Sequence, residues 1–132
     1  MPSPRFTPAV AIVVAMRQVL IGESHADVRD LLVRMVVRLG YEPRLVHGPL
    51  DPRDLRGVAL AIVEPADPAN AVIAKALALA RPSLPIISVS VLANPRIDVP
   101  FCARLMKPFT FEQLAAAMTQ ALADAAVRPA AA

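Results

Sequence analysis

Five polar residues directly follow aliphatic runs that have the character of buried strands, and their types could support chemistry with cations. They are Glu23, Ser24, Glu64, Ser90 and Lys107. Because the carboxyl ends of parallel strands meet at one edge of a sheet, two carboxylates, two hydroxyls and one ammonium should converge there. Such a set could hold a divalent cation through its carboxylates. It could equally form a structural ion pair that caps the sheet.

Several polar residues near these positions also have simpler interpretations. Ser24 has Asp27 three residues later, a spacing typical of a helix N-cap. His25 is expected to face solvent, since no nucleophile lies at a suitable spacing. Asp67 directly precedes a proline and is expected to be a turn residue. Ser90 could be a buried hydroxyl with a local hydrogen-bond partner.

The elements that must position these residues alternate between aliphatic strands and helices. Strands are predicted at residues 19–21, 44–46, 58–63, 85–91 and 102–106. The run 58–63 (VALAIV) is apolar throughout, which is typical of a central parallel strand covered on both faces. The alternation predicts an α/β fold with an open, doubly wound sheet of five parallel strands.

Three helices are predicted from apolar periodicity and end signals. The first follows Ser24 and closes at Gly40 as a left-handed cap, the second begins at Pro68, and the third follows a capping box formed by Thr110 and Gln113. Their expected buried faces are, in order, Val28, Leu31, Leu32, Met35, Val36 and Leu39; Val72, Ile73, Ala76, Leu77 and Ala80; and Phe111, Leu114, Ala117, Met118 and Leu122.

Two connections leave little room for helices. Residues 51–55 allow a turn or two, and residues 92–101 contain two prolines and no sustained helical period, so a loop is expected there. In this loop Ile97, Val99 and Phe101 could be packed core or a surface for a partner.

From about Gln18 to Ala123 the chain resembles a bacterial response-regulator receiver domain. The resemblance rests on the polar residues at the strand ends, on Lys107-Pro108-Phe109, and on the first strand and helix, VLIGESHADVRDLLVRMVVRLGYE. It implies a flavodoxin-like (CheY-like) sheet with strand order 2-1-3-4-5. Ser90 and Lys107 are only 17 residues apart, so the fourth helix is expected to be shortened, as is the second.

The resemblance also implies roles for individual residues. In that family two adjacent acidic residues after the first strand bind Mg²⁺, and an Asp after the third strand accepts a phosphoryl group from a histidine kinase. By position, Glu23 and Ser24 correspond to the acidic pair, and Glu64 corresponds to the phosphoacceptor. Glu23 and Glu64 are the expected metal ligands, and their binding is expected to be weak. Ser90 and Lys107 stand where the family contacts the phosphoryl oxygens.

Two further positions belong to the same comparison with the family. The peptide bond before Pro108 is expected to be cis, which only proline makes inexpensive. Arg104 stands where the family usually has an aromatic switch residue, and it is either a surface charge or a second cation for Glu64.

The departures from the family pattern predict a change of function. Mg²⁺ requires near-ideal octahedral oxygen geometry, which a longer Glu64 and an uncharged Ser24 serve poorly. Phosphoryl transfer depends on positioning and charge neutralisation, so phosphorylation is expected to be impaired or absent. The Glu64 carboxylate is expected to reach toward Lys107, in the space that a phosphoaspartate would fill.

The expected function is two-component (phosphorelay) signal transduction by an atypical receiver domain that is not an enzyme and acts through protein contacts. The expected partner is a sensor histidine kinase or another two-component protein, and homodimer formation stays open. One alternative is a working, metal-dependent phosphoacceptor. Another is a small flavodoxin-like enzyme or ligand-binding protein, which is disfavoured because no Gly-rich phosphate loop follows the first strand.

Composition limits the remaining function classes. The chain has 132 residues, 56% of them hydrophobic, and a net charge of +3, which suits one aliphatic domain. Its arginines are scattered singly without interleaved aromatic residues, which argues against nucleic-acid binding. The single cysteine, Cys102, is expected to be buried, and its solitary occurrence suits a reducing, cytoplasmic compartment.

The ends of the chain are expected to lie outside the domain. The predicted divisions are an N-terminal extension at 1–17, the receiver-like domain at 18–124 and an Ala-rich tail at 125–132, with no room for an output module. The apolar run 9–16 is too short to span a membrane and lacks a small-residue cleavage site before Arg17. Met16 is a second candidate for the initiator residue.

Overall fold

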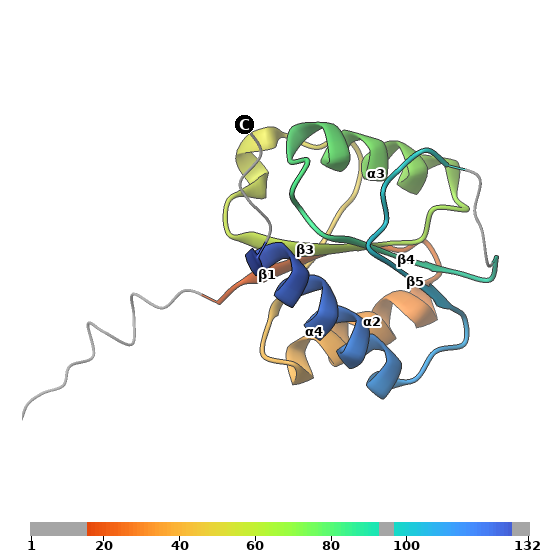
Figure 1. The fold of residues 1–132 in the computed structure, drawn as a ribbon. Coiled ribbons are helices and arrows are strands. Elements are labelled where there is room, and N and C mark those ends of the chain that lie inside the picture. The colour runs from red at the N-terminus through yellow and green to blue at the C-terminus, as the bar shows by residue number, and fades with distance from the viewer. Residues whose placement is uncertain (1–15, 93–96, 128–132) are drawn as a thin grey trace, which may run out of the picture.

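The computed structural model describes residues 16–92 and 97–127, which form a five-stranded parallel sheet with helices on both faces (Figure 1). The strands are β1 (Gln18–Gly22), β2 (Glu42–Leu45), β3 (Val58–Val63), β4 (Ile86–Ser90) and β5 (Ala103–Met106). Their order across the sheet is β2-β1-β3-β4-β5, and every neighbouring pair is parallel. The predicted fold class and strand order are therefore confirmed.

Strand β3 is the centre of the sheet and is paired on both sides. Its Ala61 lies opposite Leu20 of β1 and Ile86 of β4. Alternate side chains of a strand point to opposite faces, so Leu60 packs in one core cluster while Ala61 packs in the other. Because both faces are covered, every position of β3 is apolar.

The helices form two layers around this sheet. Helices α2 (Ala26–Arg38) and α4 (Phe111–Val127) cover one face. Helix α3 (Pro68–Ala80) and the short 3₁₀ helix η1 (Pro52–Leu55) cover the other (Figure 1). Each layer buries aliphatic side chains against the strands, which is the main source of stability for a chain with so few aromatic residues.

The predicted helix-end signals are present where they were expected. Gly40 follows α2 with a φ of 92°, and the N–H groups of Gly40 and Tyr41 donate to the carbonyls of Val37 and Val36 at 3.0 and 3.1 Å. This is a Schellman motif, which glycine favours. At the start of α4, Gln113 N–H donates to Thr110 Oγ1 at 3.1 Å, and Thr110 N–H donates to Gln113 Oε1 at 2.8 Å, forming the capping box.

Helix α3 buries only part of the face predicted for it. Ile73 and Leu77 are buried as predicted, whereas Val72 is 67% exposed, and Asn70 and Ala74 are buried in addition. The helix has alanine on every side, so the difference in hydrophobicity between its faces is too small to define the buried face from sequence. The faces predicted for α2 and α4 contain all the buried residues of those helices except Ala121.

The described part of the connection between β4 and β5 packs apolar loop residues against the core. Val99 is buried, and Ile97 and Phe101 are half-buried against the cluster beneath α3, so the three apolar residues are packed core. Within residues 91–92 and 97–102 there is no helix. The shortened second helix is the four-residue η1.

The predicted ends lie mostly outside the described residues, namely 1–15 of the extension and 128–132 of the tail. Helix α4 continues to Val127, past the boundary predicted at residue 124. Cys102 is exposed rather than buried, because it directly precedes β5 at the edge of the sheet, and its thiol donates to the Ile86 carbonyl at 3.4 Å. Among the helices of the described residues, none is long and apolar enough to cross a membrane.

Candidate functional site

The carboxyl ends of four strands bring the predicted polar residues to one edge of the sheet. Glu23 follows β1, Glu64 follows β3, and both are buried. The N–H of Glu64 donates to the Gly22 carbonyl at 2.8 Å, and the N–H of Lys107 donates to the Ser90 carbonyl at 2.8 Å. These backbone bonds extend the parallel ladders past the strands and hold the site residues side by side.

Lys107 forms its ion pair with Glu23. The distance from Lys107 Nζ to Glu23 Oε1 is 2.7 Å, and the two side chains are 16% and 1% exposed. Glu23 Oε2 accepts a hydrogen bond from the His25 backbone N–H at 3.1 Å. Glu23 Oε1 has no partner in hydrogen-bond geometry, so the ammonium holds that oxygen by charge rather than by an aligned donor. His25 is exposed, as predicted.

Glu64 folds back on the loop that follows it. Its Oε1 accepts the N–H of Ala66 at 3.1 Å, and its Oε2 accepts the N–H of Asp67 at 3.2 Å. Among the described residues no ion pair includes Glu64, so the expected meeting of Glu64 with Lys107 is wrong. Loop N–H groups near a buried edge need acceptors, and the glutamate side chain is long enough to supply both oxygens.

Ser24 joins the β1–α2 loop to the start of α3. Its hydroxyl donates to Asp67 Oδ2 at 2.6 Å and accepts from Asn70 Nδ2 at 3.1 Å. The prediction that Ser24 caps α2 is wrong: His25 is the N-cap residue, and it has no capping hydrogen bond from its side chain. A carboxylate is a stronger acceptor than a neutral group, and the Asp67 carboxylate lies within reach of the hydroxyl.

Asp67 has two roles at the start of α3. Its Oδ1 accepts the N–H of Ala69 at 2.8 Å, which makes Asp67 the N-cap of α3, directly before Pro68. The Ser24 hydroxyl and then the Ala69 N–H hold the pKa of Asp67 below its ordinary value, against a smaller opposing effect of burial. The sequence Asp-Pro before an apolar helix is an N-cap signal, whereas Asn70 has no local signal that would reveal its contact with Ser24.

We expect Asp67→Ala to lower the urea midpoint of unfolding near neutral pH, because it removes a helix cap and the acceptor of Ser24. The pKa of Asp67 in the folded chain lies below the unfolded value of about 3.9. The stabilisation by the charged carboxylate is therefore complete above about pH 5 and is lost as the pH falls through the folded pKa. The midpoint difference from the native chain should be constant between about pH 5 and 7 and should shrink in more acidic solution.

A matched control for this measurement is Asp30→Ala, which changes an exposed aspartate inside α2. It should show neither the loss at neutral pH nor the change with pH. An Asp67→Ala midpoint equal to that of the native chain at pH 7 would contradict the assignment of Asp67 as cap and Ser24 partner.

Ser90 and Arg104 make contacts with residues other than Glu23 and Glu64. Ser90 is buried and its Oγ accepts the N–H of Leu92 at 3.0 Å, which agrees with a locally satisfied hydroxyl. The Arg104 guanidinium carbon lies 5.4 Å from the centroid of the Phe101 ring, so Arg104 makes a cation–π contact and is not a second cation for Glu64. The Lys107–Pro108 peptide bond is cis, in agreement with the prediction.

Comparison with solved structures identifies the fold as that of CheY-like response-regulator receiver domains. A receiver domain protein from Methanospirillum hungatei superimposes with a TM-score of 0.69 at 16% identity, covering 85% of this chain and 98% of that one. The response regulator TrrA from Thermotoga maritima, in complex with Mg²⁺ and BeF, gives 0.64 at 18% identity, covering 81% and 100%.

A third structure, NtrX from Brucella abortus in complex with ADP, gives a TM-score of 0.68 at 19% identity. The match covers 86% of this chain but spans only 28% of the NtrX chain. No protein-family model matches the sequence, and no curated protein matches it. At these identities the likeness establishes the fold.

The polar edge does not fit the Mg²⁺ that the receiver fold implies. Within the residues described, no group of three or more His, Cys, Asp or Glu side chains is placed to hold a metal ion. Glu23 Oε1 is the buried oxygen that a cation could satisfy, but the Lys107 ammonium already lies 2.7 Å from it. Mg²⁺ needs several oxygen ligands in octahedral geometry, while both oxygens of Glu64 accept backbone N–H groups.

Proposed function

We propose that this chain acts in cytoplasmic two-component signalling as an atypical receiver domain that works through protein contacts and is not phosphorylated at Glu64. Its partner in this proposal is a sensor histidine kinase or another two-component protein. The fold shared with response-regulator receiver domains supports the signalling class. The hydrogen bonding of Glu64 supports the absence of phosphorylation.

The observation that carries the proposal is that both oxygens of Glu64 are used within its own loop, on the N–H groups of Ala66 and Asp67. An in-line attack on a phosphoryl group needs a carboxylate oxygen that points outward and a cation to neutralise charge. Turning Glu64 outward would break both of these partly buried hydrogen bonds, each of which contributes about 0.5–1.5 kcal/mol. This cost adds to the barrier for phosphoryl transfer.

The residues around Glu64 support the same proposal. In this fold Lys107 and Ser90 stand where receivers contact phosphoryl oxygens, but Lys107 is paired with Glu23 and the Ser90 hydroxyl accepts from Leu92. Ser24 is held by Asp67. Each group that would bind a metal ion or a phosphoryl group therefore has a partner within the chain, and such a site favours one static arrangement.

The proposal is tested by incubating the full chain with acetyl phosphate and Mg²⁺ and measuring intact mass and peptide masses. We expect no phosphoryl adduct on the native chain. A conventional receiver domain in the same mixture serves as the positive control. A phosphoryl adduct that maps to Glu64 in the native chain would overturn the proposal.

The matched variant is Ser24→Asp with Glu64→Asp, which supplies the acidic residues that the receiver family has at these positions. The variant restores the shorter carboxylate and the second acid of the family pattern, so we expect the double variant to be phosphorylated. If the double variant is folded but unmodified, local substitution is not the cause of inactivity, and the short connection between β4 and β5 becomes the next region to change.

A further inference from the structure

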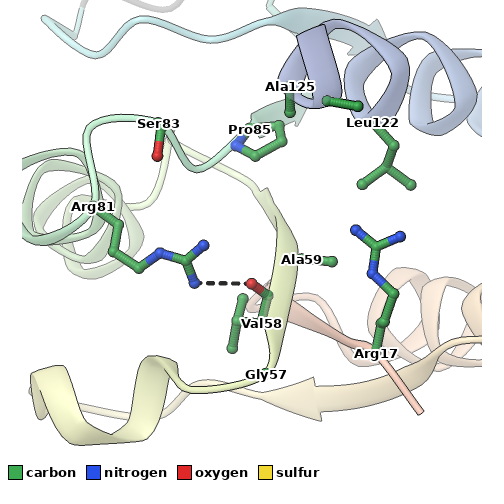
Figure 2. A pocket seen from close by; sticks show the side chains of 10 residues that line it. Arg17, Gly57, Val58, Ala59, Arg81, Ser83, Pro85, Leu122 and Ala125 are labelled. Atoms are coloured by element: carbon green, nitrogen blue, oxygen red, sulfur yellow. Dashed lines mark hydrogen bonds between the residues drawn. The ribbon is translucent and has the colours of Figure 1, made fainter. Parts of the chain in front are cut away.

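An open cavity of about 540 Å³ lies at the amino-terminal ends of the strands, at the opposite edge of the sheet from Glu23 and Glu64 (Figure 2). Residues 57–59 at the start of β3 form its floor, and Pro85 precedes β4 at its side. The volume is typical of pockets that bind small molecules. The cavity does not include Glu23, Glu64 or Lys107, so ligand binding there would not depend on the signalling function proposed above.

Two arginines line this cavity and approach it from either side of β3, Arg17 from before β1 and Arg81 from the end of α3 (Figure 2). The ten lining residues are all described, and none of them is Asp or Glu. Two like charges at one cavity without an acidic partner favour the binding of an anion.

Arg81 is held in place by the backbone. Its Nη1 donates to the carbonyls of Leu55 and Val58 at 3.0 and 2.8 Å, and the second of these bonds is drawn in Figure 2. A guanidinium has five N–H donors, and among the described residues these two bonds are the ones its guanidinium makes. Donors therefore remain for a ligand on a group whose position is already fixed, which lowers the entropic cost of binding.

Three acidic residues that neighbour the cavity in sequence or in strand pairing make contacts with other residues. Glu42 accepts from the Gln18 amide at 3.4 Å, and Asp124 accepts from the Gln120 amide at 2.8 Å. Asp54 pairs with Arg44 at 3.5 Å. Among the ion pairs of the described residues, none includes Arg17 or Arg81. The charge of the two arginines is thus not neutralised by an ion pair within this part of the chain.

We propose that this cavity binds a small organic anion, with a phosphate or carboxylate group attracted by the charges of Arg17 and Arg81 and an apolar body against α4. The body would lie on Leu122, Ala125 and Pro85, which form the apolar wall of the cavity (Figure 2). Guanidinium groups recognise oxyanions through paired hydrogen bonds. A cavity of this size with two charges suits a small molecule rather than a nucleic-acid backbone, which requires a longer basic track.

The test is a titration of the ¹⁵N-labelled full chain with phenyl phosphate at constant ionic strength, followed by amide NMR shifts. We expect saturable shifts at Gly57, Ser83 and Ala125, with none at Glu23 or Glu64. Inorganic phosphate should bind more weakly because it lacks the apolar body, and benzyl alcohol should not bind because it lacks the charge. Benzoate tests whether a carboxylate replaces the phosphate group.

Variants distinguish specific binding in the cavity from non-specific attraction of the anion to a positively charged protein. Arg17→Gln should weaken the affinity for phenyl phosphate at least about tenfold, since it removes charged hydrogen bonds. Arg34→Gln removes the same charge from an exposed position on α2 and should leave the affinity unchanged. Arg81→Lys keeps the positive charge but loses the planar set of N–H donors of the guanidinium, so it should also bind phenyl phosphate more weakly. A thermal melt checks that this variant is folded.

Several results would overturn the proposal. They are the absence of saturable shifts around the cavity, shifts confined to the Glu23 and Glu64 edge, an equal loss in Arg17→Gln and Arg34→Gln, or inorganic phosphate binding as tightly as phenyl phosphate. Because the Arg17 side chain makes no ion pair within the described residues, its variant keeps the test decisive even where Arg81→Lys fails to fold.

Discussion

Lys107→Met is expected to lower the free energy of unfolding by about 3 kcal/mol, measured by urea denaturation at pH 7. Its ammonium lies 2.7 Å from Glu23 Oε1, and the Glu23 side chain is 1% exposed. Removing one member of a buried ion pair leaves the other as an unpaired charge away from water, which typically costs about 3–5 kcal/mol. We expect the lower end of this range because the Lys107 side chain is 16% exposed to solvent.

The other lysine of the chain provides a matched control. Lys75 is exposed on α3, so Lys75→Met should change the free energy of unfolding by less than about 0.5 kcal/mol. Glu23→Gln combined with Lys107→Met removes both charges and should be more stable than Lys107→Met alone. A double variant as unstable as Lys107→Met would show that the loss comes from the lysine stem rather than from the unpaired carboxylate.

The fold could be predicted from the sequence because its strongest patterns are local. The run 58–63 is apolar at each position and is the central strand β3 with the predicted bounds. Gly40 and the Thr110–Gln113 pair identify helix ends by their own chemistry. Where composition gives little contrast, as in the alanine-rich α3, the pattern predicted the helix and the burial of Ile73 and Leu77 but not the exposure of Val72.

The site could be predicted only as a group of residues at one edge. Parallel topology is enough to place Glu23, Glu64 and Lys107 near each other. It does not determine which carboxylate the lysine contacts, because that depends on whether a side chain reaches across the edge or folds back on its own loop. Glu64 folds back onto the N–H groups of its loop, and Lys107 contacts Glu23.

The interaction of Ser24 shows the same limit for contacts between distant segments. Local spacing favoured a cap on α2, but the acceptor, Asp67, is 43 residues away and comes from the β3–α3 loop. The hydroxyl thereby joins the first loop of the edge to the N-terminus of α3. Through Asp67 and Asn70, the packing of α3 on the sheet determines where that loop is held.

Leu77→Ala tests that packing and is expected to lower the free energy of unfolding by about 3 kcal/mol in urea. Leu77 is 0% exposed in the cluster between α3 and the sheet, so its truncation removes buried surface and leaves a cavity. Leu79, two residues later on the same helix, is 83% exposed. Leu79→Ala should therefore change stability by less than about 0.5 kcal/mol. Equal losses in the two variants, or a larger loss for Leu79→Ala, would mean that α3 is rotated about its axis, and the contact of Asn70 with Ser24 would then have to be reassigned as well.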